Sequence, residues 1–358
     1  MKKDKQNKKK RKALPIILIV LGSLPALVAG VFLYGYLKLG SMRRGSVPIV
    51  PAPVDVGNVT AEPVDLVPVE NPDELDLSED YDPEIDPADF GNDDIFQRDA
   101  IDENVVNILL LGNDARDEFD HGRTDTMLLL SYNRQTREAK LISFLRDTWI
   151  YIPGRDKWNR INTAYRFGGI GLAINTLNYN FDLDIQNYVR VDFNAMKAIV
   201  DSIGGIDIEL TEREVEYINN GVSEKLPVHA GWHHLNGAQT LWHARNRSIG
   251  GDGDWSRTRR QRNVLNAILN RLKKERNVSS LISILYTMID HVETNMNPSQ
   301  IVSLGVDVIF GGSFSLKDRA LPFEGTWEYA WEGRMAVIHI DIRANRNKLH
   351  EYLYGSID

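Results

Sequence analysis

Three near-continuous apolar runs constrain the fold of this 358-residue chain more than any other feature. Residues 105–111, 127–131 and 140–144 are short and rich in Leu, Ile, Val, Met or Phe, and a polar turn at residues 133–137 separates the last two. Such runs suit strands that are buried on both faces, because strands with one wet face alternate apolar and polar residues. The sheet that they form therefore needs a covering layer on each side.

Helical patterns between and after the strands supply these layers. Residues 186–191, 193–202 and 206–210 predict a strand, a helix and a second strand, with a break at Gly204 and Gly205. Further helices are predicted for residues 169–177, 237–244 and 257–274. The alternation predicts an α/β fold with a mixed central β-sheet flanked by helices on both faces, in α-β-α layers. Residues 275–358 are expected to form further helices and a final strand at 336–341.

The N-terminal third predicts a membrane-anchored protein. Residues 1–12 are a basic tail, and residues 13–37 are an uncharged apolar run long enough to cross a bilayer core of roughly 30 Å. The positive-inside rule then keeps the tail in the cytoplasm and places the rest of the chain outside the cell membrane, as a single-pass protein. A cleaved signal peptide is the alternative, but its apolar region is usually only about 7 to 15 residues long.

The segment after the predicted anchor has a different composition. Residues 1–45 carry a net charge of about +10, whereas residues 46–100 carry about −15 and eight of the fourteen prolines. Such a segment buries too little apolar surface to offset the entropy of ordering it. Residues 38–100 are therefore predicted to be a disordered extracellular stalk, followed by an extracellular domain at 101–358 with its core at 104–274.

Arginines concentrate in one stretch of the predicted domain. Six lie within the eighteen residues 245–262, around a glycine-rich acidic break at 249–254. After the break, apolar residues recur at helical spacing through 264, 265 and 268, and the same face runs back through Gln261, Arg257 and Asp254. Asp254 is expected to precede the first turn and cap its amides. These amides and guanidinium groups predict an anion site, and an arginine-rich surface helix is the alternative.

Acidic and basic residues also follow the first strands. Asp114 and Arg116 come after the first run, Arg123 and Asp125 precede the second, and Arg146 and Asp147 end the third. Strand ends are where sites gather in such folds. Two carboxylates without a nearby thiol or histidine suit a hard cation such as Mg²⁺. Turn caps and a salt bridge explain the same residues equally simply.

Together these residues resemble the LytR-CpsA-Psr family. The resemblance extends over residues 104 to about 274 and rests on LLLGNDAR, RTDTMLLLS, SFLRDTWIYIPG, RINTAYRFGG, VDSIGGIDIEL, LNGAQTLWHARNR and DWSRTRRQ. It implies a membrane-anchored phosphotransferase of Gram-positive envelopes that attaches polyprenyl-pyrophosphate-linked glycopolymers, such as wall teichoic acid or capsule, to peptidoglycan. The implied partners are that lipid-linked polymer, a peptidoglycan acceptor and the membrane, and no nucleic acid.

The resemblance also implies roles for individual residues. Asp114 and Asp125 match the family's ligands for Mg²⁺, or for Mn²⁺ in its place. The implied catalytic residues are Arg123, Arg146 and Asp254, although Asp147 is an equal candidate for the general base. The implied pyrophosphate-binding residues are Arg116, Arg123, Arg146, Arg160, Arg245, Arg247, Arg257 and Gln261. The family often has Lys at position 160, Pro at 145 and Tyr at 243, where this chain has Arg160, Leu145 and His243.

Other functions fit the sequence less well or remain open. A chain without cysteine has no disulfide, thiolate metal site or cysteine nucleophile. No G-x-S-x-G element suggests a serine hydrolase, and His229, His233, His234 and His243 lack a recognised zinc spacing. A polyprenyl-pyrophosphate phosphatase that uses water as acceptor, or a non-enzymatic envelope regulator, remains an alternative.

Overall fold

The computed structural model describes residues 47, 49–50, 95–113, 124–153, 155, 157–274, 292–310 and 315–355. The predicted tail at 1–12 and anchor at 13–37 lie outside these residues, as does most of the predicted stalk. Among the helices of the described ranges, none is long and apolar enough to cross a membrane.

The centre of the fold is a six-stranded sheet with the order β11-β8-β3-β4-β5-β12. Its strands are β3 (Val105–Asn113), β4 (Thr124–Asn133), β5 (Glu138–Phe144), β8 (Asn187–Asp192), β11 (Val292–Thr294) and β12 (Ser315–Leu321). β3 pairs antiparallel with β4 and parallel with β8, while β12 pairs parallel with β5. The predicted mixed sheet is therefore confirmed, and the three apolar runs form its centre.

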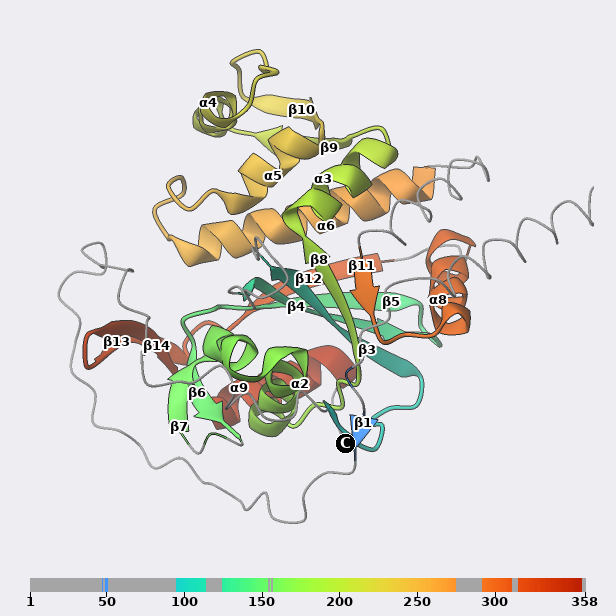
Figure 1. The fold of residues 1–358 in the computed structure, drawn as a ribbon, viewed down its shortest axis with the longest axis vertical. Helices are drawn as coiled ribbons and strands as arrows, with labels where there is room; N and C mark the ends of the chain where they lie inside the picture. Colours follow the sequence, from blue (N-terminus) through green and yellow to red (C-terminus); the bar gives the residue numbers. More distant parts are fainter. Residues whose placement is uncertain are drawn as a thin grey trace, which may run out of the picture.

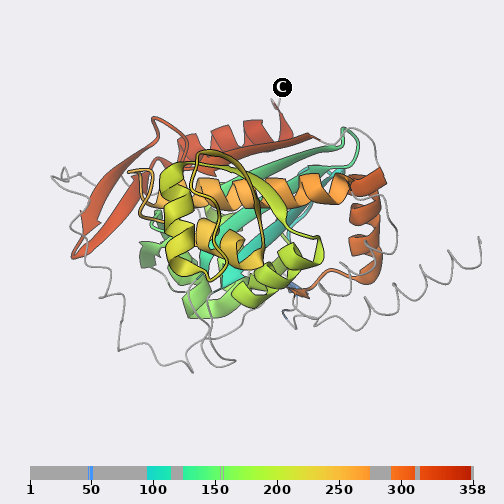
Figure 2. The same cartoon turned by 90° about the horizontal axis from the view of Figure 1, so that it is seen from above.

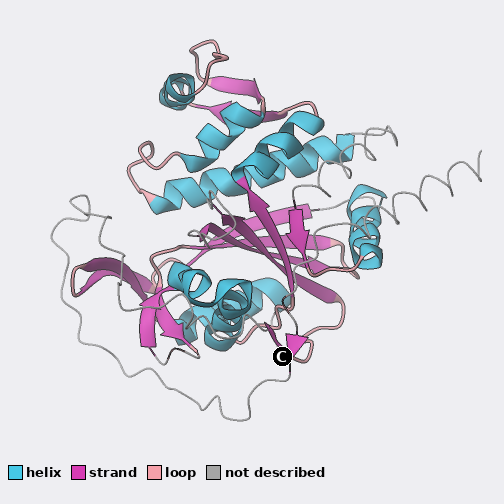
Figure 3. Cartoon of the chain, in the orientation of Figure 1, coloured by secondary structure: helices cyan, strands magenta, loops and turns pink. Residues whose placement is uncertain are grey.

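Helices cover both faces of the sheet, as predicted. One face carries α2 (Ile161–Phe181) and α9 (Ile342–Tyr354), and the other carries α3 (Phe193–Ser202), α5 (Gly237–Arg245) and α6 (Asp254–Lys274) (Figure 1). Figure 2 shows the second group of helices lying across the sheet from above. Colouring by secondary structure makes the two helical layers and the strands between them distinct (Figure 3).

The central strands divide their leucines between the two faces because successive side chains of a strand point in opposite directions. Leu109 and Leu129 are fully buried in a core with α2 and α9. Their neighbours Leu110 and Leu128 face α3, α5 and α6 and line a cavity. Each near-continuous apolar run thus contributes side chains to a packed core on one face of the sheet and to a cavity on the other face.

The remaining elements form smaller units around these layers. They are β1 (Ile49–Val50) with β2 (Ile95–Phe96), β6 (Trp149–Ile152) with β7 (Lys157–Arg160), β9 (Ile206–Leu210) with β10 (Gly231–Leu235), β13 (Trp327–Glu332) with β14 (Met335–Ile340), α4 (Glu212–Gly221) and α8 (Pro298–Phe310). α3 and β9 have the predicted bounds, but β9 pairs with β10 outside the central sheet.

The predicted domain boundary at residue 101 is too late. Ile95 in β2 is fully buried in the core shared with α2 and α9, and the amide of Phe96 donates to Asn175 Oδ1 at 2.9 Å. Ile49 in β1 pairs with Ile95, so short pieces of the predicted stalk belong to the fold. A two-residue strand is too short to alter the acidic, proline-rich composition on which the prediction rested.

Two further differences concern the lengths and number of elements. Helix α2 is longer than the predicted 169–177, and it contains a break where Gly168 and Gly169 leave helical geometry, with Gly169 at φ 58°. The structure also adds the edge strand β12 to the predicted C-terminal elements. Its sequence, SLKDRAL, is charged in the middle, where Asp318 pairs with Arg262 at 2.6 Å. β14 corresponds to the predicted final strand.

Candidate active site

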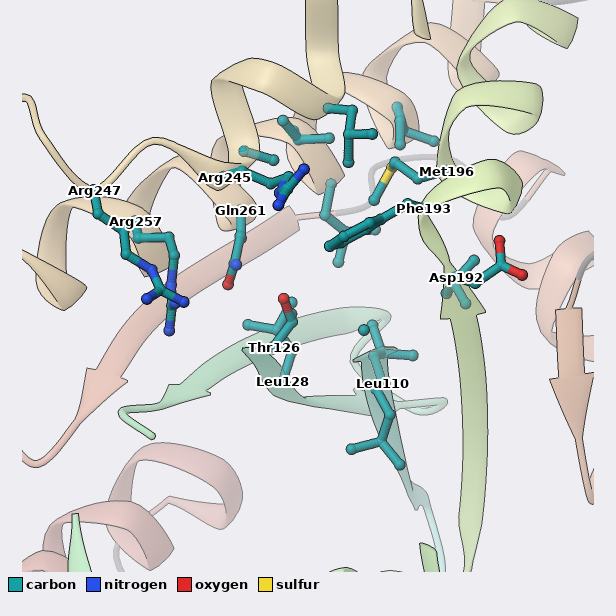
Figure 4. Close-up of a pocket in the computed structure, with 18 residues that line it drawn as sticks. Leu110, Thr126, Leu128, Asp192, Phe193, Met196, Arg245, Arg247, Arg257 and Gln261 are labelled. Atoms are coloured by element: carbon teal, nitrogen blue, oxygen red, sulfur yellow. The ribbon is translucent and has the colours of Figure 1, made fainter. Parts of the chain in front are cut away.

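A cavity of about 290 Å³ lies between the central sheet and the helices α3, α5 and α6 (Figure 4). Its lining is Leu110, Leu111, Gly112, Thr126, Leu128, Val191, Asp192, Phe193, Met196, Leu241, Ala244, Arg245, Arg247, Arg257, Gln261, Val264, Leu265 and Ile268. Most of these side chains are apolar, whereas three arginines and a glutamine are contributed by α5, α6 and the segment between them. The cavity therefore suits a ligand with an apolar body and an anionic group.

Helix α6 presents the face that its spacing predicted. Val264, Leu265 and Ile268 line the apolar part of the cavity, and Gln261 and Arg257 follow one and two turns toward the N-terminus. Gln261 Oε1 is buried and accepts no hydrogen bond from any described residue. Since a buried polar atom usually has a partner, this amide is available to a ligand.

The six clustered arginines separate into two groups of three. Arg245, Arg247 and Arg257 line the cavity, and in Figure 4 the side chains of Arg247 and Arg257 point toward the same end of it. The guanidinium of Arg245 lies 4.6 Å from the centre of the Phe193 ring, which holds it over the cavity by a cation–π contact. Arg257 is almost completely buried, with 1% of its surface exposed.

The other three arginines form structural ion pairs. Arg259 pairs with Asp252 at 2.7 Å, Arg260 donates Nε to Glu214 at 2.8 Å, and Arg262 joins Asp318. Arg262 also donates to Ser143 Oγ at 2.8 Å, so it ties α6 to the sheet. Of this cluster, only the three cavity-lining arginines were predicted from the sequence to bind pyrophosphate.

Two carboxylates, Asp147 and Asp254, lie beside this group within a set of arginines. Arg146 Nε is 3.3 Å from Asp147 Oδ2 and 3.7 Å from Asp254 Oδ1, and Arg257 Nη2 forms an ion pair with Asp254. Asp254 Oδ2 is buried and accepts no hydrogen bond from a described residue. Burial raises the pKa of Asp147, Arg146 opposes this rise and the nearby Asp254 adds to it. The pair thus places two proton-accepting oxygens next to guanidinium groups.

Helix α6 begins at Asp254, three residues before the predicted start, and this changes the role of Asp254. The amide of Trp255 donates to the Asp252 carbonyl at 3.1 Å, and that of Arg257 donates to the Gly253 carbonyl at 3.3 Å. The Asp254 side chain pairs with Arg257 instead of capping these amides. Of the predicted anion site, the guanidinium groups therefore line the cavity, whereas the amides of Trp255 and Arg257 are bonded to backbone carbonyls.

Arg160 lies beside the carboxylates but outside the cavity lining. Its Nε and Nη2 atoms donate to the Ala336 carbonyl at 3.1 and 2.8 Å, and Nε is 3.6 Å from Asp147 Oδ1. Only 5% of its surface is exposed. The structure thus uses this arginine to fasten β14 next to Asp147, and its predicted contact with pyrophosphate stays a prediction.

In the sequence, one proposed metal ligand, Asp114, directly follows β3, and the other, Asp125, belongs to β4. Gly112 pairs with Thr126 and Asn113 with Thr124, so Asp125 occupies a bulge in β4 without a partner in the ladder. Bulges commonly redirect a side chain toward a site. Asp114, Arg116 and Arg123 lie outside the described residues, as does the side chain of Asp125.

One described oxygen beside this bulge is of the kind that suits a hard cation. Thr124 Oγ1, next to the bulge, is buried without a hydrogen-bond partner among the described residues. Oxygen donors of this kind are what Mg²⁺ prefers. Within the described part of the chain, no group of three or more His, Asp or Glu side chains could hold a metal.

Sequence patterns did not identify two residues of the cavity lining, Gly112 and Phe193, as part of the site. A Cβ atom added to Gly112 would lie 2.8 Å from Thr126 Cβ, so glycine allows these two strands to meet at the lining. Phe193 supports Arg245 from the first turn of α3, where Asp192 caps the helix by accepting from the Ala195 amide at 2.7 Å. The one sequence feature that could have indicated this arrangement is the pair Asp192 and Phe193, which directly ends the strand β8 and begins the helix α3.

The histidines do not join this site. His243 is buried on α5, and both ring nitrogens lack hydrogen-bond partners among the described residues. Burial lowers its pKa to about 4, Glu214 opposes the change and Arg260 adds to it. His229 and His233 stack with ring centres 4.3 Å apart, and His234 bonds to Asp207 at 2.7 Å.

These features define a class of protein, namely an α/β domain with an apolar cavity between sheet and helices and guanidinium groups at its polar end. The chain belongs to the LytR_cpsA_psr family, whose profile matches residues 84–347. This assignment agrees with the resemblance seen in the sequence motifs.

Individual relatives and solved structures are similar over much of the chain. The chain is 33% identical over 199 residues to the polyisoprenyl-teichoic acid–peptidoglycan teichoic acid transferase TagU of Bacillus mycoides, a match that covers 56% of this chain and 63% of that relative. The structure of TagT bound to LI-WTA has a TM-score of 0.59 and 23% identity and covers 72% of this chain and 93% of TagT. YwtF (TagT) with bound octaprenyl pyrophosphate lipid has a TM-score of 0.55 and 21% identity, with coverages of 72% and 94%.

Proposed function

We propose that this protein is a phosphotransferase that attaches a polyprenyl-pyrophosphate-linked glycopolymer to peptidoglycan. The observation that carries the proposal is the amphiphilic cavity, in which an apolar lining meets Arg245, Arg247 and Arg257. Supporting it, TagU is named as a transferase of teichoic acid to peptidoglycan, and the solved YwtF structure holds octaprenyl pyrophosphate. The matched segment spans less than two-thirds of TagU.

The donor lipid would bind with its prenyl chain in the apolar part and its pyrophosphate at the arginines. Planar guanidinium groups bind phosphate oxygens in pairs, which makes them better suited to pyrophosphate than ammonium groups are. The volume of about 290 Å³ is near the lower end of ordinary ligand pockets, roughly 300–1,000 Å³. We infer that the cavity encloses the part of the prenyl chain nearest the pyrophosphate.

The acceptor hydroxyl would attack the sugar-linked phosphorus of the donor. A new bond forms between the acceptor oxygen and this phosphorus, the bond to the bridging oxygen breaks, and the lipid phosphate leaves with that oxygen. The hydroxyl proton passes to Asp254 or Asp147. Asp254 Oδ2 and Asp147 Oδ1 are buried and accept no hydrogen bond from a described residue, whereas Asp147 Oδ2 already accepts one from Arg146 Nε. Arg146, which lies between these carboxylates, and the predicted catalytic Arg123 would stabilise the charge on the transferred phosphoryl group.

Asp114 and Asp125 would hold Mg²⁺ beside the pyrophosphate. The bound ion would neutralise negative charge on the phosphate oxygens, a common role of divalent cations in phosphoryl transfer. Asp114→Ala or Asp125→Ala should therefore abolish Mg²⁺-dependent turnover, and adding EDTA to the wild type should do the same. Turnover that keeps its full Mg²⁺ response in both variants would remove these residues from the site.

The location that we propose is the outer face of the cell membrane, with residues 13–37 as the single membrane span and the N-terminus in the cytoplasm. The support is the charge asymmetry around this apolar run. Protease added outside protoplasts should then digest the domain and spare the N-terminal tail. Protection of the domain in this assay would contradict the orientation.

The reaction is tested with the full-length chain in detergent micelles, Mg²⁺, a lipid-linked glycopolymer analogue and peptidoglycan fragments. We expect a phosphodiester-linked product and lipid phosphate release that depends on the acceptor, because a positioned hydroxyl reacts faster than free water. Equal release with and without acceptor, and no coupled product, would instead identify a phosphatase.

Matched arginine variants test the site within the same assay. Arg245→Lys and Arg247→Lys should each weaken binding of a short-chain prenyl pyrophosphate at least about tenfold, since lysine keeps the charge but loses the paired geometry. Arg259→Lys is the control, because Arg259 is exposed and pairs with Asp252 outside the cavity. An equal loss of prenyl pyrophosphate affinity in all three variants would show that the arginines act only as general surface charge.

A further inference from the structure

The hairpin of β13 and β14 is fastened directly beside the candidate active site. The amide of Ile338 in β14 donates to the Asp147 carbonyl at 2.8 Å, and Arg160 donates twice to the Ala336 carbonyl. Arg160 is also within 3.6 Å of the Asp147 carboxylate. The position of this hairpin is therefore coupled to one of the two candidate bases, and Figure 1 shows it extending outward from that end of the domain.

The hairpin carries a row of aromatic side chains on one face. Trp327, Tyr329 and Trp331 occupy alternate positions of β13, so they point to the same side and follow one another at about 6.5–7 Å along the strand. Tyr329 is 39% exposed and Trp331 is 41% exposed, so both rings present apolar surface to the solvent. Glu328 and Glu332 occupy the opposite face.

The inner end of this row packs against the start of α6. The Trp327 ring lies 5.1 Å from the ring of Trp255, which directly follows Asp254, and 5.1 Å from the ring of Tyr329 in an edge-on arrangement. These contacts fix Trp327 and leave the outer rings open. The aromatic row thus begins next to Asp254 and ends at the exposed ring of Trp331.

Electrostatics also places Tyr329 close to the carboxylates. Burial raises the pKa of Tyr329, a hydrogen bond with Trp255 opposes this, and Asp252, Asp254 and Asp147 each add to the rise. The ring contacts from Tyr329 through Trp327 to Trp255, which directly follows Asp254, connect this side of the hairpin to the carboxylates. Carboxylate oxygens accept hydrogen bonds but cannot donate them.

Exposed aromatic rings next to carboxylates favour a neutral polyhydroxylated ligand. Aromatic faces stack on the C–H faces of sugar rings, and sugar hydroxyls donate to carboxylates. Anionic lipid is disfavoured beside Tyr329 because Asp252, Asp254 and Asp147 each act on this ring with negative charge. Continuity with Asp147 and Asp254 means that an occupant of this face presents its hydroxyls to the candidate bases.

We propose that the exposed face of Tyr329 and Trp331 is the subsite for the acceptor glycan, which stacks there while one hydroxyl reaches Asp147 or Asp254. This assignment rests on the proposed transferase function and adds the residues that recognise the acceptor. Tyr329 and Trp331 are separate from the cavity that binds the donor, so donor and acceptor affinity should respond to different substitutions.

Binding is measured first, on the full-length chain with soluble peptidoglycan glycan fragments that lack the lipid. Tyr329→Ala and Trp331→Ala should each raise the dissociation constant about tenfold, and Trp331→Phe should restore most of the affinity because it keeps a stacking ring. The control is Trp232→Ala, since Trp232 is 69% exposed on β10 and belongs to a different two-stranded sheet. Thermal unfolding of each variant checks that the fold is intact.

Donor binding and transfer are measured on the same proteins. The two alanine variants should bind prenyl pyrophosphate like the wild type, while KM for the acceptor rises about tenfold in the transfer assay. Unchanged acceptor affinity in both alanine variants, or an equal loss in Trp232→Ala, would overturn the subsite. Loss of binding to phosphatidylcholine vesicles with unchanged glycan binding would identify a lipid-facing surface and would overturn it as well.

These measurements also separate the two proposals. Suppose that the wild type binds prenyl pyrophosphate and transfers polymer while acceptor affinity does not depend on Tyr329 and Trp331. This result would leave the proposed function in place and refute the subsite. A wild-type protein that binds neither prenyl pyrophosphate nor inorganic pyrophosphate refutes the proposed function itself.

Discussion

The buried His243 should make the protein less stable as the pH falls. Its pKa is lowered to about 4 by burial, whereas an unfolded chain has the ordinary value of about 6.5. A depressed pKa contributes stability that is present above the unfolded value and is lost as pH falls toward the folded value. At 1.36 kcal/mol per pH unit, this interval corresponds to at most about 3.4 kcal/mol, and at pH 5 about 2 kcal/mol is already lost.

The test compares the wild type with His243→Phe. Phenylalanine keeps a flat ring in a site where neither imidazole nitrogen has a partner among the described residues, and it cannot be protonated. The free energy of unfolding is measured by urea titration at pH 7.5, 6.5, 5.5 and 5. The variant should gain about 2 kcal/mol relative to the wild type between pH 7.5 and 5.

A second histidine provides a control of opposite sign. Hydrogen bonding to Asp207 raises the pKa of His234, so its contribution is present below the unfolded value and is lost as the pH rises. The wild type should therefore gain stability over His234→Gln as the pH falls. If the wild type and His243→Phe give parallel curves over this range, the reasoning from burial is wrong.

Three further predictions concern the cavity and the carboxylates. Ala244→Phe fills part of the cavity and should weaken short-chain prenyl pyrophosphate binding about tenfold by calorimetry, while inorganic pyrophosphate binds as before. Arg257→Lys should weaken pyrophosphate binding at least about tenfold, whereas Arg262→Lys, equally buried but directed away from the cavity, should lower only the Tm. Because burial raises the pKa of Asp147, its ionised form costs stability, so Asp147→Asn should gain Tm relative to the wild type as pH rises from about 4 to 7.

Local periodicity was enough to predict the layers and the active face of α6. Residues 257, 261, 264, 265 and 268 share one side of a helix whatever the helix packs against, so the sequence identifies the stripe directly. The three central strands were recognised for a similar reason, since continuous burial on two faces leaves a distinctive apolar run. Both signals depend only on spacing within a few residues.

Features that depend on distant partners were not predictable in this way. The β12 sequence is polar because its charged residues pair with residues of α6 and β5 at the edge of the sheet. The residues around Arg160 give no sign that this arginine also fastens β14. Likewise, the sequence could not place the hairpin aromatics next to Asp254, because about seventy residues separate Trp255 from Trp327. Such contacts arise from topology, which spacing does not encode.

The central sheet separates the proposed lipid site from the protein's own hydrophobic core by a single layer of backbone. Leu109 and Leu129 on one side, and Leu110 and Leu128 on the other, are consecutive residues of the same strands. A larger or smaller side chain on one face of these strands therefore shifts the backbone that also carries the side chains of the opposite face. Adapting the cavity to a longer or bulkier lipid would thus require compensating changes beneath α2 and α9, which couples substrate range to the architecture of the whole domain.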